Sequence, residues 1–300
     1  MLTERSTPAG PRPPPEQPAR RAHARLVVTA DDLGRSRAVN AAVARASREG
    51  VLTAASLMVT GEAAAEAVAL ARSTPALAVG LHLVLADGRP ALPGREVPHL
   101  VGPDGRLERD PARAGLRWAA SAPARRELAR EIEAQFALFA ATGLPLSHVD
   151  GHHHLHVHPA AFPVVAELAR RHGARGVRLP WEGLTALREA VPGRAAVEAL
   201  ALGALALGWR PLARRLGLAF AARVHGIVRS GGMDEAYVAA LIERLEVPTA
   251  EIFLHPSTEA EEGRGANPGD LATLLGPAVR RSVADRGVAL ASYGTLEVGG

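Results

Sequence analysis

The sequence predicts an α/β fold, a distorted parallel (β/α) barrel of about seven strands, in a single domain with a helical insertion. Short β-branched runs alternate with amphipathic helical stretches along nearly the whole chain. Titratable residues recur where the apolar runs end, which is where such barrels place their active sites. No G-x-G-x-x-G follows the first run, and this disfavours a dinucleotide-binding open sheet.

The first half of the chain contains three strand-and-helix signals and one long interruption. The predicted strands are ARLVVTADD (24–32), LTAASLMVT (52–60) and ALAVGLHLVL (76–85), with helices at 36–50 and 62–73 between them. Residues 86–124 are rich in Gly and Pro and too long for an ordinary connection, so we expect a lid or substrate loop there. A helix at 124–143, ending at Gly143, restores regular structure.

The second half continues the alternation. Strands are predicted at 146–152, 176–180, 222–228, 249–256 and 288–294, and helices at 162–173, 233–245 and 270–287. Between the strands at 176–180 and 222–228 we expect a helical insertion. The order of elements favours a barrel in which parallel strands are joined by helices.

Composition limits the chemistry before any motif is considered. With 300 residues, 47% of them hydrophobic, the chain is long enough for a large buried core. It has no cysteine, so disulfides and thiolate metal sites are excluded, and any metal must be bound by imidazole and carboxylate groups. The net charge is +4 and all the basic residues are Arg, so the pI near 10.6 overstates the positive charge at pH 7.

The N-terminal segment differs in composition from the rest of the chain. Residues 1–24 are rich in Pro and Arg and are expected to form a disordered tail, whereas 25–300 form the barrel domain. The tail lacks the apolar core of a secretion signal, so we expect a cytoplasmic protein, and an Arg-rich transit or nucleic-acid-binding arm is the alternative.

One apolar stretch raises the question of a membrane. In AVEALALGALALGW (196–209) the unbroken apolar run is shorter than the roughly 20 residues that cross a bilayer. A buried helix is one interpretation. The other is a surface helix that, with Arg210, Arg214 and Arg215, rests at the inner membrane or on a lipid substrate.

Acidic, basic and imidazole groups lie in the predicted strands, mostly at their ends. Asp31 and Asp32 end the first strand, Asp150 and His152 the fourth, and His255 the strand EIFLHP, whereas His82 lies within the third and Arg178 within the fifth. Each has an ordinary alternative, since Asp31 or Asp32 could cap the following helix and His82 could be a core histidine. Adjacent strand residues point to opposite faces, so Asp31 and Asp32 are expected to have different roles.

The stretch SHVDGHHHLHVHP (147–159) holds six of the twelve histidines. If it is extended, steps of two residues advance about 6.6 Å, whereas ligand nitrogens lie about 2.0 to 2.1 Å from an ion. One ion can therefore take one of these histidines, or two neighbours at most, and Asp32 and His82 are the remaining suppliers. One carboxylate and two imidazoles leave room for water and substrate, as in hydrolytic metal sites.

Several motifs together carry a family resemblance. VVTADDLGRSRAVNAAV, LTAASLMVTG, VGLHLVL, HVDGHHHLHVHP, VRLP and EIFLHPS resemble the ChbG/YdjC-like carbohydrate deacetylases across roughly residues 25–295. GLHLVLADGRPALP, SAPARRELAREIEAQF and HGIVRSGGMDEAYVAALI are most similar to the hopanoid-biosynthesis-associated members. Where the family commonly has Asp-Phe-Gly, Leu33 replaces Phe, an apolar exchange.

The resemblance implies metal-dependent removal of an acetyl group from an N-acetylated amino sugar, in the hopanoid-associated members an N-acetylglucosaminyl hopanoid lipid. The implied ligands of one divalent ion (zinc, magnesium or another transition metal) are Asp32, His82 and His152. We hypothesise that metal-activated water attacks the acetamide, that Asp31 is the base and His255 the acid, and that Arg178 supports the oxyanion.

Several questions stay open at this stage. His154 or Asp150 could orient a ligating imidazole, and His153, His156 and His158 have no assigned role. A soluble chitooligosaccharide is the alternative substrate. The alternative classes of protein are a phosphoesterase and a non-enzymatic, histidine-rich metal-binding protein. The expected partner is an N-acetylated sugar or glycolipid and not nucleic acid, with a peripheral membrane contact and a homodimer both compatible with the sequence.

Overall fold

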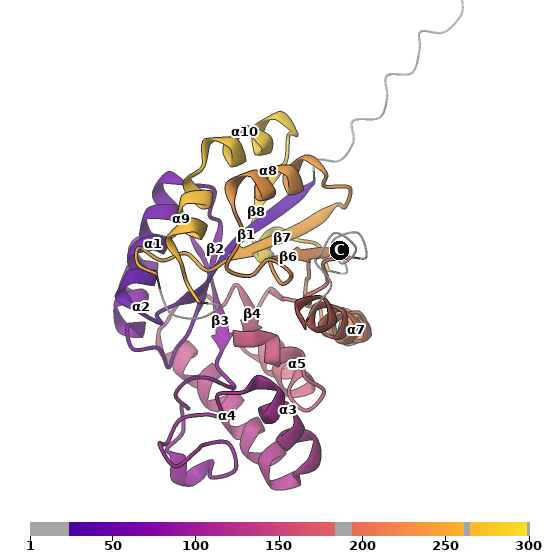
Figure 1. Ribbon diagram of the computed structural model, residues 1–300. Helices are drawn as coiled ribbons and strands as arrows, with labels where there is room; N and C mark the ends of the chain where they lie inside the picture. Colours follow the sequence, from indigo (N-terminus) through magenta and orange to yellow (C-terminus); the bar gives the residue numbers. More distant parts are fainter. Residues whose placement is uncertain (1–23, 184–193, 261–264, 299–300) are drawn as a thin grey trace, which may run out of the picture.

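The computed structural model describes residues 24–183, 194–260 and 265–298, and within them eight parallel strands form one sheet (Figure 1). The order is β5-β4-β3-β2-β1-β7-β6, and β8 pairs with β1 beside this path. The strands are β1 (Arg25–Leu33), β2 (Ala54–Leu57), β3 (Ala78–Leu83), β4 (His148–Gly151), β5 (Gly176–Val177), β6 (Arg223–His225), β7 (Thr249–Leu254) and β8 (Ala289–Ala291).

Helices surround this sheet, as expected where parallel strands are buried on both faces. The α-helices are α1 (Arg37–Glu49), α2 (Ala64–Ser73), α3 (Pro111–Ala120), α4 (Ala122–Ala141), α5 (Phe162–Arg171), α7 (Arg194–Arg215), α8 (Glu235–Glu243), α9 (Pro268–Leu275) and α10 (Pro277–Asp285). Short 3₁₀ turns are η1 (Gly94–Glu96), η2 (His152–Val157) and η3 (Tyr293–Thr295). In Figure 1, α1, α2 and α9 lie on one side of the sheet and α7 on the other, with α3 to α5 below.

The two outer strands of the curled sheet, β5 and β6, are linked by one short segment. Ala219 forms a parallel bridge with Gly176 of β5, and the amide of Val177 donates to the carbonyl of Ala219 at 2.9 Å. Only four residues further on, Arg223 pairs with Ala250 of β7. The predicted distorted parallel barrel is therefore confirmed, and its distortion lies where β5 and β6 are too short to pair along their length.

The start of α1 settles one alternative for the two aspartates. The Ser36 hydroxyl accepts a hydrogen bond from the amide of Val39, which is the capping contact of this helix. Asp31 and Asp32 stand inside β1 instead. Neither carboxylate is used as the cap, so both are available for other contacts.

Two predictions, a loop and a helix, need correction. The long connection 86–124 contains the helix α3, which Asp110 caps and which buries Trp118, so it is only partly a loop. The predicted helix 270–287 is broken between α9 and α10, because Gly276 adopts an extended ψ of 132° and Pro277 follows. The Glu235 carboxylate fills the corner and accepts from the amide of Ala278 at 2.6 Å.

The predicted helical insertion is present as α7. Within the described residues it is the one helix whose length and mean hydropathy would allow it to cross a membrane, over Ala196–Arg215. This span is longer than the unbroken apolar run in the sequence indicated. Only 22% of the window with that composition is buried, which favours the surface interpretation over the buried one. The predicted tail, apart from Ala24, lies outside the described residues.

The core between α4 and the sheet provides a test of the packing. The Phe136 side chain on α4 is fully buried, whereas Leu138 on the same helix is 42% exposed. Phe136→Ala is expected to lower the free energy of unfolding by about 3 to 5 kcal/mol, because a large cavity is left behind. Leu138→Ala, the control, should change it far less, as measured by urea unfolding. Equal losses in the two variants would contradict this placement of α4.

Candidate active site

Three side chains predicted as metal ligands meet at the carboxyl ends of the strands. Asp32 Oδ1 lies 3.3 Å from His82 Nε2 and 3.2 Å from His152 Nδ1. Asp32 is fully buried, His82 is almost so, and His152 keeps 8% of its surface exposed. The structure therefore brings together one carboxylate of β1, one imidazole of β3 and one imidazole that follows β4.

This donor set fits a divalent ion. Within the described residues, Asp32 Oδ1 is buried and has no hydrogen-bond partner, which for a carboxylate oxygen is costly unless a cation or a proton donor approaches it. A carboxylate with two imidazoles suits zinc and other transition metals. His82 Nδ1 is 2.8 Å from Asp150 Oδ1, so that its Nε2 is the atom turned toward Asp32. The structure thus places Asp150 in the orienting position for which His154 was the alternative.

Two other groupings share some of these residues. Asp31, His82 and Asp150 come equally close, as do Asp87, His152 and His153. The first is less suitable because Arg178 already contacts both of its carboxylates. The second includes two exposed residues, Asp87 and His153. The buried trio of Asp32, His82 and His152 is the best candidate metal site.

The backbone of Asp32 explains how adjacent aspartates reach different partners. Its φ is +63°, in the left-handed region that is uncommon for residues other than Gly, and the β1–β2 register shifts between Ala30 and Leu33. Asp32 therefore turns toward the two histidines while Asp31 faces Arg178. The predicted difference in role between the two aspartates is matched by different contacts.

Arg178 lies at the centre of a buried ionic network. Its Nη1 and Nη2 donate to the two oxygens of Asp31 at 2.6 and 2.8 Å, and Nη1 also lies 3.0 Å from Asp150 Oδ2. Its Nε and Nη2 donate to Glu251 at 3.2 and 2.8 Å. Every N–H group of the guanidinium thus faces a carboxylate, and the side chain has no exposed surface. Arg178 stands one residue after β5, which is shorter than the predicted strand 176–180.

Residues that the sequence did not single out hold this network from outside. Glu251 accepts from the hydroxyls of Thr29 and Tyr293, both at 2.6 Å. Ser56 donates to Asp150 Oδ2 at 2.7 Å and lies 3.0 Å from His148 Nε2, whose ring stacks on Tyr293. Only Glu251 had a signal in the sequence, as a single acid within the apolar strand TAEIFLHP.

Burial and charge act in opposite directions on these groups. Burial alone would raise the pKa of Asp32 and Asp150, but His152 and His82 hold the pKa of Asp32 well below its usual value, and Arg178 does so for Asp150. Burial would lower the pKa of His82, but Asp150 and Asp32 raise it to about 10. The carboxylates are therefore anionic, and the site favours positive charge between Asp32 and Asp150.

The histidine run is extended only as far as Gly151. His152 to Val157 form the 3₁₀ segment η2, in which His153 and His154 have φ of 54° and 55°. His156 Nε2 donates to the carbonyl of Arg178 at 2.9 Å, and the ring of His154 packs edge-on to Phe253. Burial lowers the pKa of both side chains, to about 4 for His156. These histidines form the wall behind Arg178, and only His152 of the run joins the buried ligand trio.

His255, the predicted acid, directly follows β7. Its amide donates to Asp270 Oδ2 at 2.8 Å and its carbonyl accepts from Asn267, so its backbone is fixed from two sides. The ring is partly exposed and lies 5.7 Å, between centroids, from Phe253. Phe253 in turn covers Arg178, with the guanidinium carbon 4.6 Å above the ring. His255 is thus at the same end of the sheet as the trio, in contact with solvent.

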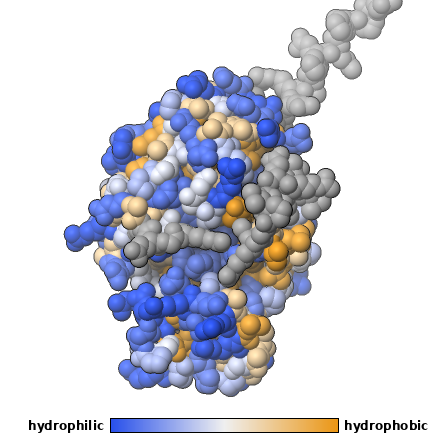
Figure 2. Space-filling view, viewed as in Figure 1, coloured by the Kyte–Doolittle hydropathy of each residue, from blue (hydrophilic) through white to orange (hydrophobic). Residues whose placement is uncertain are grey.

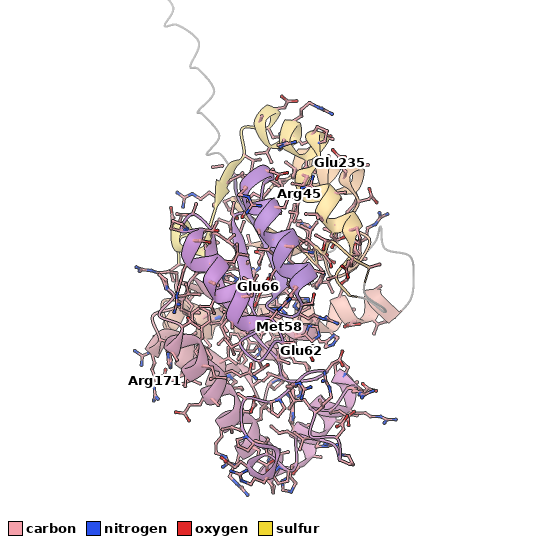
Figure 3. The ribbon with its side chains drawn as sticks, turned by 90° about the vertical axis from the view of Figure 1, so that its left-hand side faces the viewer. Arg45, Met58, Glu62, Glu66, Arg171 and Glu235 are labelled. Atoms are coloured by element: carbon pink, nitrogen blue, oxygen red, sulfur yellow. The ribbon has the colours of Figure 1, made fainter. Side chains whose placement is uncertain are left out.

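A cavity of about 330 Å³ opens beside His152. It is lined by the ends of β1, β2 and β3 and by the connection after β3; Figure 3 labels two lining residues, Met58 and Glu62. The other lining residues are mostly polar: Arg35, Ser36, Thr60, Gly61, Val84, Asp87, Gly88, Arg89 and Arg106. A polar ligand can therefore reach the exposed edge of His152 from this side.

A parallel β/α barrel with an aspartate and two histidines at its strand ends defines the class as hydrolase-like, with a site suited to one metal ion. The chain belongs to the YdjC-like protein family, whose model matches residues 25–285. This confirms the family predicted from the motifs.

Relatives and a solved structure agree with this assignment. A carbohydrate deacetylase of Geobacillus stearothermophilus is 34% identical over 89% of this chain and 96% of its own length. A chitooligosaccharide deacetylase of Klebsiella pneumoniae is 30% identical over 89% and 97%. A carbohydrate deacetylase of Brevibacillus brevis is 45% identical, but that match spans only 60% of its length. A crystal structure from Enterococcus faecalis, described as a cellobiose-phosphate cleavage protein, has a TM-score of 0.70 at 22% identity, covering 92% of this chain and 99% of that one, and shows the same fold.

The Arg178 network predicts a stability effect that depends on pH. Arg178→Met is expected to lower the free energy of unfolding at pH 7 by about 3 to 5 kcal/mol, because three buried carboxylates lose their cation. Arg178 depresses the pKa of Asp150 and Glu251, so its contribution is present above their unfolded pKa values and is lost as pH falls.

The measurement is urea unfolding of both proteins between pH 7 and pH 3, a range that crosses the unfolded pKa values of both carboxyl groups. The deficit of the variant should narrow with acidification. Arg170→Met serves as the control, because Arg170 forms an exposed ion pair with Glu167. It should unfold like the wild type at every pH. A deficit for Arg178→Met that stays constant across this range would show that lost packing, and not charge, causes it.

Proposed function

We propose that this carbohydrate deacetylase removes the acetyl group from an N-acetylated amino sugar by metal-assisted hydrolysis, and that its substrate is an N-acetylglucosaminyl hopanoid lipid. The observation that carries the metal dependence is the unpartnered, buried Oδ1 of Asp32 between two imidazole nitrogens. Carbohydrate deacetylation is supported by family membership and by the names of the two relatives matched over nearly their full length.

The proposed ligands are Asp32, His82 and His152. When bound there, a divalent ion would polarise the acetamide carbonyl and lower the pKa of a water molecule. Asp150 and Gly151 belong to β4 beside β3, so the strand pairing itself fixes the His82 ring between Asp150 and Asp32. The remaining chemistry is assigned to side chains of the chain itself.

Asp31 is the proposed general base. Both of its oxygens accept hydrogen bonds from Arg178, which fixes the orientation of the carboxylate. Since each N–H group of Arg178 is already used, we assign Arg178 to positioning Asp31 and not to direct contact with the oxyanion. His255 is the proposed acid for the leaving amine, because it is the partly exposed imidazole at the end of β7, which pairs with β1.

The lipid part of the substrate is supported by sequence and surface. The stretches that resemble hopanoid-associated members include the connection after β3, which lines the cavity beside His152. In addition, α7 exposes apolar side chains at the surface. A soluble chitooligosaccharide is the second candidate, favoured by the name of the Klebsiella relative.

Metal binding is tested by substitution of the ligands. Purified wild-type protein loaded with zinc is expected to hold about one ion per chain, the stoichiometry of a mononuclear site. Asp32→Asn and His82→Gln should retain almost none after dialysis, as measured by mass spectrometry of the metal. His172→Gln, at an exposed histidine after α5, is the control and should bind as the wild type does. Undiminished zinc in both ligand variants would place the ion elsewhere.

The base is tested by Asp31→Asn. Turnover is expected to fall by about 100-fold or more, because general-base catalysis contributes on that scale, while the zinc content stays unchanged. The amide still accepts one hydrogen bond from Arg178, so circular dichroism should show a folded variant. Turnover within about threefold of wild type would refute the role of Asp31.

The substrate is tested by incubating metal-loaded protein with an N-acetylglucosaminyl hopanoid and, separately, with chitobiose. Mass spectrometry should show loss of an acetyl group from the hopanoid. Deacetylation of chitobiose alone would assign the soluble substrate instead. If neither compound were deacetylated by protein that holds its metal, the proposed function would be wrong.

A further inference from the structure

The outward face of α7 is apolar over four turns. Of the seven large hydrophobic side chains that are exposed in the described part of the chain, three lie on this helix: Val197 at 69%, Leu200 at 53% and Leu207 at 40%. Smaller exposed residues continue the same face at helical spacing: Ala201, Ala204, Gly208 and Pro211. Figure 2 shows hydrophobic residues gathered at this side of the molecule, where Figure 1 places α7.

The opposite face of the same helix is packed against the domain. Ala199, Gly203 and Ala206 are buried, and Gly203 lies directly against the ring of Trp181, where a Cβ atom would collide. Apolar residues on the inner face are explained by this packing. Those on the outer face have no such explanation, because a helix at a protein surface normally presents polar residues to water.

The helix is also attached to the segment that supplies a candidate ligand. Trp209 Nε1 donates to the carbonyl of Val157, the last residue of η2, at 2.9 Å, and its ring stacks on Phe162 of α5. His152 begins η2. A surface that binds α7 is therefore linked to the active site through the short segment η2.

The charges at the end of the helix indicate what that surface is. From Ala196 to Arg215 the one acidic residue is Glu198, about 100° around the helix from Val197 and thus beside the apolar stripe. Arg214 and Arg215 are exposed at the carboxyl end. An apolar stripe that ends in arginines matches the boundary between acyl chains and anionic headgroups. A second copy of the chain fits less well, because one stripe with three large side chains is small against the roughly 800 Å² per partner of a stable interface.

We propose that the outer face of α7 is a membrane-docking surface that lies in the interface of an anionic bilayer. Val197, Leu200 and Leu207 enter the acyl boundary, and Arg215 contacts headgroup phosphates. This proposal extends the proposed function. It rests on that function only for the purpose of docking, which is to bring the enzyme to an N-acetylated sugar carried by a lipid at the membrane surface. Docking itself requires no substrate and no metal.

The experiment is flotation of the full chain with vesicles of phosphatidylglycerol and phosphatidylethanolamine, without substrate. Wild-type protein is expected to float with them. The double variant Leu200→Glu/Leu207→Glu should bind at least about tenfold more weakly, since two apolar anchors become anionic. Arg215→Gln should bind about fivefold more weakly to these vesicles and unchanged to pure phosphatidylcholine.

The matched control is Leu116→Glu, which places the same charge on α3 at a side chain that is 70% exposed. It should float like the wild type, and circular dichroism should show all variants folded. Wild-type protein that stays unbound, or a double variant that floats as well as the wild type, would overturn the proposal. So would light scattering that shows a wild-type dimer, a monomeric double variant and no vesicle binding, because the face would then serve a second copy.

The result is independent of the substrate assay. Vesicle binding without deacetylation of any lipid-linked sugar would support docking and refute the proposed substrate. Deacetylation of the lipid-linked sugar at equal rates by wild type and double variant in vesicles would support the proposed substrate and refute docking.

Discussion

The rest of the site depends on the buried ionic network of Arg178. This one guanidinium contacts carboxylates from β1, β4 and β7 while its own backbone continues from β5, so it links four strands of the sheet at their carboxyl ends. An arginine without solvent access is stable only with such compensation. The network therefore constrains both the curvature of the sheet and the orientation of Asp31.

The same network separates two neighbouring carboxylates into two chemical environments. Asp31 is neutralised by a permanent cation, whereas Asp32 has an oxygen that no group in the described chain satisfies. The left-handed backbone of Asp32 makes this possible, since ordinary strand geometry would turn its side chain directly away from that of Asp31. The strained residue is thus located where the site needs a carboxylate facing the histidines, which is a common place for such strain.

Much of this arrangement could be predicted from the sequence, and the remainder has physical reasons. The candidate ligands could be predicted because Asp32 ends an apolar run, His82 is the one imidazole within another, and His152 follows Asp-Gly at the end of the fourth predicted strand. The central role of Arg178 could not be predicted, because its partners Asp31, Asp150 and Glu251 are distant in sequence and meet only through strand pairing. The left-handed residues Asp32 and His153 leave no compositional trace, so the assumption of an extended histidine run held only as far as Gly151. The break at Gly276 and Pro277 did have a signal, a Gly-Pro pair inside a helical pattern.

Charge explains why the candidate metal site lies where it does. Four buried carboxylates, those of Asp31, Asp32, Asp150 and Glu251, face two arginines, of which Arg35 is partly exposed and contacts Asp32 Oδ2 at 2.9 Å. Two arginines cannot neutralise four carboxylates, and Asp32 Oδ1, beside His82 and His152, is the oxygen that no group in the described residues satisfies. A neutral ligand would leave this charge unbalanced. A divalent cation coordinated by Asp32, His82 and His152 would balance it, so the ionic network that holds Asp31 in place also makes the neighbouring position selective for a cation.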